Sequence, residues 1–160
     1  MKPNERAQQN HNELFPGHVS TLAVTDPELI ETFDNFAFDE VLAYSDLDTR
    51  TRLMIQLAAL IASQALGEYR VMVGAALTVG VTPVEIKEIV YQAVPYVGMA
   101  KVFDFIHATN EVLTERGIQL PLPGQSTTTP DTRAQKGIEV QKHIVGDDAV
   151  EKLYASARPD

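Results

Sequence analysis

The hydrophobic residues of this chain recur mainly at intervals of three and four, which is the spacing of one face of an α-helix. Such patterns run over residues 26–44, 48–66, 68–79, 82–97, 101–116 and 133–145, and a short one begins at Asp147. For the first pattern, the sequence leaves open whether the helix is continuous or broken near Phe38. No segment gives comparable support for a strand. We therefore expect an all-α fold, a bundle of six to eight helices.

Residues 80–86, Gly-Val-Thr-Pro-Val-Glu-Ile, specify a tight turn between two helices. Thr82 and Glu85 have the spacing of a capping box, in which each side chain accepts a hydrogen bond from the backbone of the other. Pro83 occupies the first helical position, where its missing N–H costs nothing. Gly80 suits the left-handed conformation that ends the preceding helix. Local chemistry thus predicts helix, turn and helix here.

Other helix ends are marked in similar ways. Asp26 precedes Pro27 and is expected to cap a helix, and Asp46 or Asp48 is expected to cap the next one. Pro95 is expected to kink or end its helix, because proline lacks the backbone donor.

The predicted helix over 48–66 is apolar on nearly every side. Its apolar residues are Leu53, Met54, Ile55, Leu57, Ala58, Leu60 and Ile61. A helix that is apolar all round has to be central in its fold or pressed against another subunit.

We expect a single domain over residues 1–160, with a core at 46–117, a linker at 117–132 and a C-terminal helical tail at 133–160. The linker holds Pro121, Pro123, Pro130 and three consecutive threonines, and it has no periodicity. Arg133-Ala134-Gln135 repeats Arg6-Ala7-Gln8 near the start of the chain. This repeat is either chance or the start of a second half-unit.

Composition excludes several classes of function. Asp and Glu number 22 against 13 Lys and Arg, a formal charge of −9, which repels phosphate backbones and argues against nucleic acid. No run approaches the roughly 20 apolar residues of a membrane span. The first residues are polar, so we expect neither export nor membrane attachment. With no cysteine, disulfides and thiol chemistry are excluded, and we expect a cytoplasmic protein.

Three motifs in order resemble the carboxymuconolactone decarboxylase family, whose relatives include the alkylhydroperoxidase D-like proteins. They are Arg50-Thr51-Arg52-Leu53 opening an Ala-rich helix, the turn at 80–86, and Tyr96-x-Gly98. The resemblance covers about residues 46–116. It implies an alkylhydroperoxidase D-like helical bundle, assembly into a homo-oligomer (a trimer or hexamer), and a place in aromatic catabolism.

The resemblance also bears on chemistry. The alkylhydroperoxidase branch uses two cysteines and a histidine, and this chain has Ala65, Glu68 and Met72 at those positions, so thiol peroxidase activity is excluded. In the decarboxylase branch a glutamate is common at the Glu68 position, together with the histidine that Met72 replaces. That branch needs no cofactor, because the lactone itself accepts the electrons.

Glu68 is the first candidate for a catalytic residue, as a general acid one turn before Met72; its alternative is a solvated carboxylate in the first turn of a helix. Met72 either lines the substrate-binding site or belongs to the hydrophobic core. His107 is a second candidate, as a proton donor or a surface residue. Tyr96 either donates its hydroxyl to a substrate carbonyl or is structural.

Two arginines are candidates for binding a substrate carboxylate, because a guanidinium offers a two-pronged donor. Arg70 lies near Glu68 in sequence and is either in the pocket or on the surface. Arg52 either binds substrate or pairs with an acidic residue across helices. His107 and Glu111 lie one turn apart but have no third ligand in view, so no metal is expected.

The leading hypothesis is a cofactor-independent lyase (a decarboxylase) or isomerase acting on a small carboxylated lactone or related unsaturated organic acid. The partner is then a small anionic substrate. The alternative is a non-enzymatic oligomeric small-molecule-binding protein that has lost the family's histidine.

Overall fold

The computed structural model describes residues 3–157, and every regular element among them is helical, as the periodicity predicted. The residues fall into two compact units that divide between Leu122 and Pro123. The last residues of the predicted tail, 158–160, lie outside the described part. The expectation of one domain over the whole chain stays a prediction.

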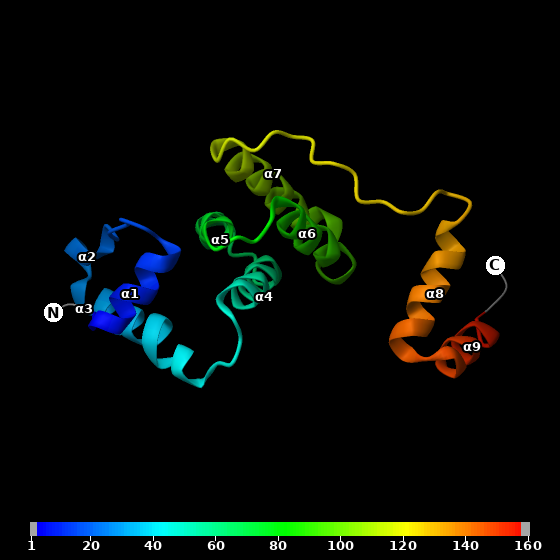
Figure 1. Ribbon diagram of the computed structural model, residues 1–160, viewed down its shortest axis with the longest axis horizontal. Coiled ribbons are helices and arrows are strands. Elements are labelled where there is room, and N and C mark those ends of the chain that lie inside the picture. The colour runs from blue at the N-terminus through cyan, green and yellow to red at the C-terminus, as the bar shows by residue number, and fades with distance from the viewer. Residues whose placement is uncertain (1–2, 158–160) are drawn as a thin grey trace. The chain divides into compact units, whose positions relative to one another are not determined.

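The core of the first unit is a group of four helices. They are α4 (Thr49–Ala62), α5 (Leu66–Thr78), α6 (Pro83–Val97) and α7 (Met99–Glu115). Helix α4 packs on α5 and α6, and α7 packs on the same two helices (Figure 1). Side chains from all four helices, among them Leu57, Tyr69, Val90 and Phe105, are buried together.

A second group of short helices precedes this core. It comprises α1 (Glu5–Leu14), α2 (Leu22–Thr25), α3 (Pro27–Asn35), a π-helical turn η1 (Phe36–Glu40) and a 3-10 turn η2 (Leu42–Tyr44). Helix α1 packs on α3, η1 and α5, and it buries Ala7 and Leu14. The pattern over 26–44 is therefore three elements rather than one helix, and its break begins at Phe36.

Several predicted helix ends are confirmed. Thr82 and Glu85 form the complete capping box, with Pro83 opening α6. Gly80 and Gly117 have positive φ values of 86° and 76° after α5 and α7. Helix α6 ends at Val97, two residues after Pro95.

Two other predictions about helix ends differ from the structure. Helix α3 begins at Pro27 after Asp26 as expected, but the Asp26 side chain makes no capping hydrogen bond. Helix α4 stops at Ala62 rather than near Leu66, because Gln64 adopts a φ of 61° and the Ala65 N–H donates to the Leu60 carbonyl. Neither glycine nor proline marks this stop.

Helix α4 is not buried all round by the described residues. Its core face is Leu53, Leu57 and Ile61, whereas Ile55 is 53% exposed and Ala58 is exposed as well. A central position in the fold therefore explains the apolar residues on one face of α4 but not those on its exposed face.

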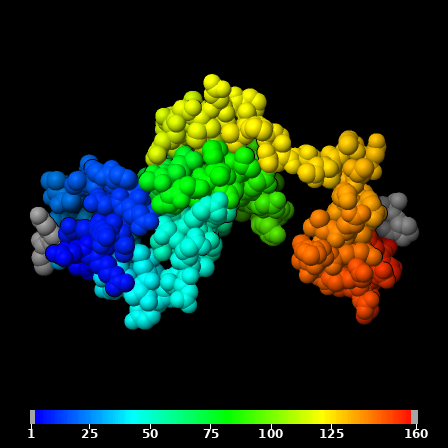
Figure 2. Space-filling view, viewed as in Figure 1, coloured from blue at the N-terminus to red at the C-terminus, as the bar shows by residue number. Residues whose placement is uncertain are grey.

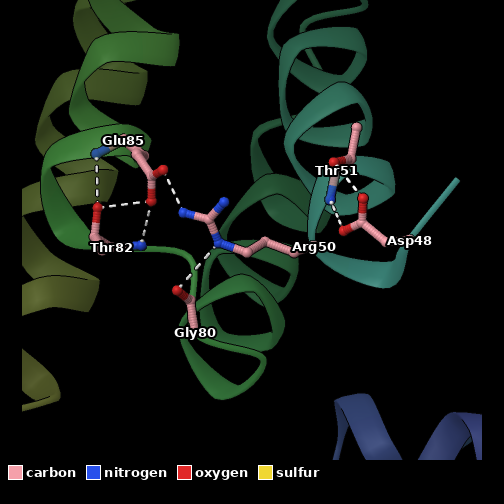
Figure 3. A network of polar contacts seen from close by, with 6 residues as sticks. All are labelled: Asp48, Arg50, Thr51, Gly80, Thr82 and Glu85. Atoms are coloured by element: carbon pink, nitrogen blue, oxygen red, sulfur yellow. Dashed lines mark hydrogen bonds and ion pairs between the residues drawn. The ribbon is translucent and has the colours of Figure 1, made fainter.

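The turn between α5 and α6 is tied to the start of α4 (Figure 3). Arg50 donates from Nε to the Gly80 carbonyl oxygen at 3.3 Å, and its guanidinium pairs with the Glu85 carboxylate. The same carboxylate accepts from the backbone N–H of Thr82 at 2.8 Å and from its hydroxyl at 2.7 Å. The Glu85 side chain thus takes part both in the local capping box of α6 and in the long-range contact with Arg50.

The second unit is a hairpin of α8 (Arg133–Val145) and α9 (Asp147–Ala155), coloured orange to red in Figure 2. Both bounds of α8 match the prediction, and Gly146 makes the turn with a φ of 90°. Val150 is buried between the two helices, while Ile144 and Leu153 are exposed.

Replacement of the cap at α6 tests the importance of this junction. Thr82→Ala removes the hydroxyl that accepts the Glu85 N–H, and we expect it to lower the free energy of unfolding by about 1 kcal/mol. Thr82→Ser keeps the hydroxyl and is the matched control. Urea unfolding followed by circular dichroism measures both. Equal stability of Thr82→Ala and wild type would contradict the assigned cap.

A second test uses pH. Hydrogen bonds from the Thr82 backbone and hydroxyl, and then from Arg50, lower the pKa of Glu85 from 4.5 to about 2. The unfolded chain therefore binds this proton at higher pH than the folded one, so the stabilisation is present above 4.5 and is lost as pH falls toward 2. We expect Glu85→Gln to lose less stability than wild type over that range in urea unfolding. Parallel pH profiles would show that Glu85 has no such role.

Candidate functional site

A cavity of about 520 Å³ lies in the first unit between the short N-terminal helices and the four-helix core. This volume falls within the range of about 300–1,000 Å³ that is usual for small-molecule sites. Its lining residues are Arg6, Asn10, Glu13, Leu14, Phe15, Phe33, Ala37, Phe38, Leu42, Thr49, Arg52, Gln56, Ala59, Leu60, Glu68 and Met72.

Helix α4 presents one polar face to this cavity. Asp48 starts the helix by accepting from the Thr51 N–H at 2.9 Å and from its hydroxyl at 2.7 Å (Figure 3). Arg52 and Gln56 then follow one turn apart on the cavity side. Leu53, the next residue after Arg52, belongs to the core face. The register set at the cap therefore separates the cavity face from the core face.

Helix α5 contributes Glu68 and Met72, which are also one turn apart. Glu68 is exposed to solvent, and Met72 is half-buried. Tyr69 lies between them on the core side, where its hydroxyl is 2.7 Å from Oγ1 of Thr109. Burial raises the pKa of Tyr69 to about 12, so this phenol stays neutral. The contact between Tyr69 and Thr109 anchors α5 against α7.

The opposite side of the cavity is held in place by hydrogen bonds among the short helices. The Asn4 N–H donates to Oδ1 of Asn35 at 2.8 Å, and Nδ2 of Asn10 donates to the Phe38 carbonyl oxygen at 2.6 Å. Arg6 forms an ion pair with Asp39, with 3.2 Å between Nε and Oδ1. These contacts fasten α1 to α3 and η1.

Only some of the charged side chains that line the cavity have an ion-pair partner. Arg6 already has Asp39 as its partner. Arg52 is half-buried and forms no ion pair with any residue in 3–157, and the same holds for Glu68. The sequence suggested that Arg52 pairs with an acidic residue across helices. It is Arg50 instead that makes such a pair, with Glu85. Arg52 is thus available to an anion in the cavity.

Three of the six candidate residues come together here, namely Glu68, Arg52 and Met72. The other three do not line the cavity. Tyr96 is 88% exposed at the end of α6. His107 is exposed and packs edge-on against Phe103, with ring centroids 4.9 Å apart. Arg70 pairs with Glu111 on α7, outside the cavity lining.

Sequence reasoning missed the N-terminal half of the cavity. Arg6 was noticed only as part of a repeat, and Phe33 only as part of a helical pattern. The polar sequence of α1 gave little sign of a helix. No local sequence feature indicated that this helix would line the same cavity as Glu68 and Met72.

Residues 3–157 hold no group of three or more His, Asp or Glu side chains placed to bind a metal ion. No helix in the described range has both the length and the hydropathy that a bilayer crossing needs.

Comparison with known proteins supports the resemblance found in the motifs. The family described as the carboxymuconolactone decarboxylase family matches residues 27–111, which is more than half of the chain and runs from α3 into α7. No curated protein matches the chain. The matched range contains Arg52, Glu68 and Met72, and every regular element of residues 3–157 is helical, as the resemblance implies. The chain therefore belongs to the carboxymuconolactone decarboxylase family.

Proposed function

We propose that this protein is a cofactor-independent lyase or isomerase that acts on a small carboxylated lactone or a related unsaturated organic acid. The observation that carries the proposal is the cavity that an unpaired Arg52 and the Glu68 carboxyl line together, beside apolar and aromatic side chains. Family membership supports the decarboxylase type of reaction. The absence of cysteine from this chain removes the thiol peroxidase reaction of related proteins.

In this proposal Arg52 binds a carboxylate of the substrate and so positions it beside Glu68. For a decarboxylation, the bond between the carboxyl carbon and its neighbour breaks, and carbon dioxide leaves. The electron pair passes through the double bond to the lactone carbonyl and forms an enolate. Glu68 then donates its proton to carbon, and solvent returns a proton to Glu68. An isomerase would use the same carboxyl to remove one proton and return it elsewhere.

Oligomer formation fits the outward face of α4. Ile55 and Ala58 are apolar and exposed on a helix whose other face is core. We propose that a second copy covers this face in a homo-oligomer, and that the protein works in the cytoplasm, where proteins without disulfides are common.

A binding protein without turnover is the second candidate. It is favoured by Met72, which presents an apolar thioether to the cavity at the position where the resemblance leads us to expect histidine. Calorimetric titration and turnover assays on the same carboxylated lactones separate the two functions. Binding without conversion supports the second candidate, and release of carbon dioxide supports the first.

Glu68→Gln tests the role of the proposed acid. The amide keeps the size of the side chain but has no acidic proton, so we expect folding and oligomer size to be unchanged and turnover to fall about 100-fold or more. Release of carbon dioxide from a panel of lactones with one and with two carboxylates, carboxymuconolactone among the latter, is the assay. Glu88→Gln, on the exposed side of α6, is the matched control and should keep full activity.

Two outcomes would overturn this assignment. One is normal turnover in Glu68→Gln. The other is loss of activity in Tyr96→Phe or His107→Ala, since both of these side chains lie away from the cavity.

A further inference from the structure

Both sides of the cavity mix polar and apolar side chains, but its aromatic residues all lie on the N-terminal side. They are Phe15, Phe33 and Phe38, here called the aromatic wall, whereas Arg52, Gln56 and Glu68 lie on the core side. Phe38 is the centre of the aromatic wall. The Phe38 ring meets Phe15 at 6.3 Å and 84°, and Phe33 at 6.3 Å and 87°, both edge-on. Such pairs are rigid and mutually attractive.

The backbone of the π-helical turn holds Phe38 at this position. The Val41 N–H donates to the Phe36 carbonyl oxygen at 2.9 Å, which closes a turn one residue wider than that of an α-helix. Two adjacent residues of this turn, Ala37 and Phe38, line the cavity. The ring of His11 stands edge-on to Phe38 from another side, at 5.0 Å. The aromatic wall is therefore built before any ligand enters.

Charge limits what can lie between the two sides. Arg52 is the one lining cation without a carboxylate partner among the described residues, because Arg6 is paired with Asp39. Glu13 and Glu68 place two carboxyl groups in the same lining. A ligand with one carboxylate is matched by Arg52. A second carboxylate would find no unpaired cation among the described lining residues, and its neighbours would be these two glutamates, the aromatic wall or neutral side chains such as Gln56.

We infer that the substrate of this site is a monocarboxylic acid with a planar, apolar, unsaturated body, and that dicarboxylic acids bind poorly. The carboxylate lies at Arg52 and the planar body lies against the aromatic wall, which places an unsaturated carbon beside Glu68. This inference rests on the proposed function, in that the cavity is taken to be the reaction site. It narrows that function to one class of acid.

Calorimetric titration with three matched acids tests the inference. The probes are trans-cinnamate, which has one carboxylate and a ring, 4-carboxycinnamate, which adds a second carboxylate, and crotonate, which lacks the ring. We expect trans-cinnamate to bind about 10-fold more tightly than either of the others.

Variants assign the contacts. Arg52→Gln should weaken trans-cinnamate about 10-fold or more, the scale of a lost charge-assisted hydrogen bond. Arg70→Gln is the matched control, because Arg70 pairs with Glu111 outside the cavity, and it should leave binding within about 2-fold. Phe38→Leu should weaken trans-cinnamate about 3- to 10-fold and leave crotonate unchanged. Phe33→Leu replaces it if Phe38→Leu does not fold.

The inference is overturned if trans-cinnamate does not bind, if 4-carboxycinnamate binds as tightly, or if Arg70→Gln has the effect of Arg52→Gln. These results are separable from failure of the proposed function. Selective binding of trans-cinnamate with no turnover of any acid would leave the inference standing and remove the lyase. Turnover of a dicarboxylated lactone with tight binding would do the reverse.

Discussion

Arg50 reaches from the first turn of α4 to the turn between α5 and α6, where it binds the Gly80 carbonyl and the Glu85 carboxylate (Figure 3). Glu85 is at the same time the acidic half of the capping box that begins α6. One carboxylate therefore serves both a local and a long-range purpose. Because an α-helix turns as a rigid unit, fixing Arg50 on one side of α4 also fixes the direction of the residues that follow. Leu53 and Leu57 then enter the core, and Arg52 enters the cavity.

The cavity depends on the same division of faces, because its two walls come from different parts of the chain. The core helices supply Arg52 and Glu68, and the N-terminal segment supplies the aromatic wall together with Arg6, Asn10 and Glu13. In the proposed reaction, a carboxylate bound at Arg52 beside these apolar rings is less screened than a carboxylate in bulk water, which strengthens its attraction to the guanidinium.

Family membership and the individual features of this chain answer different questions. The family match covers the elements from α3 into α7 and accounts for the fold. Methionine at position 72 and the aromatic wall at Phe15, Phe33 and Phe38 are features of this chain's own site. They add apolar surface to the cavity, and we infer that this surface disfavours strongly charged ligands. The reaction therefore has to be argued from these side chains rather than from the family name.

The sequence by itself determined the elements whose causes lie within one helical turn. The capping box at Thr82, the left-handed Gly80 and both bounds of α8 were predictable, because each depends on hydrogen bonds or dihedral angles of neighbouring residues. The helical spacing of Glu68 and Met72 likewise put them on one face. The stop at Ala62 was not predictable, since Gln64 adopts a left-handed angle that its residue type does not favour.

Tertiary structure alone decided which distant side chains meet. Arg50 and Arg52 are indistinguishable as candidates for an ion pair in the sequence, and only the rotation of α4 against α6 assigns the pair to Arg50. Helix α1 lines the same cavity as Glu68 and Met72, and the contacts of Asn4 with α3 and of Asn10 with η1 hold it there. Tyr96 and His107 carry suitable chemistry, but their helices direct them to solvent. Local hydrogen bonds act over a few residues, whereas a cavity is made by the packing of segments far apart in the chain.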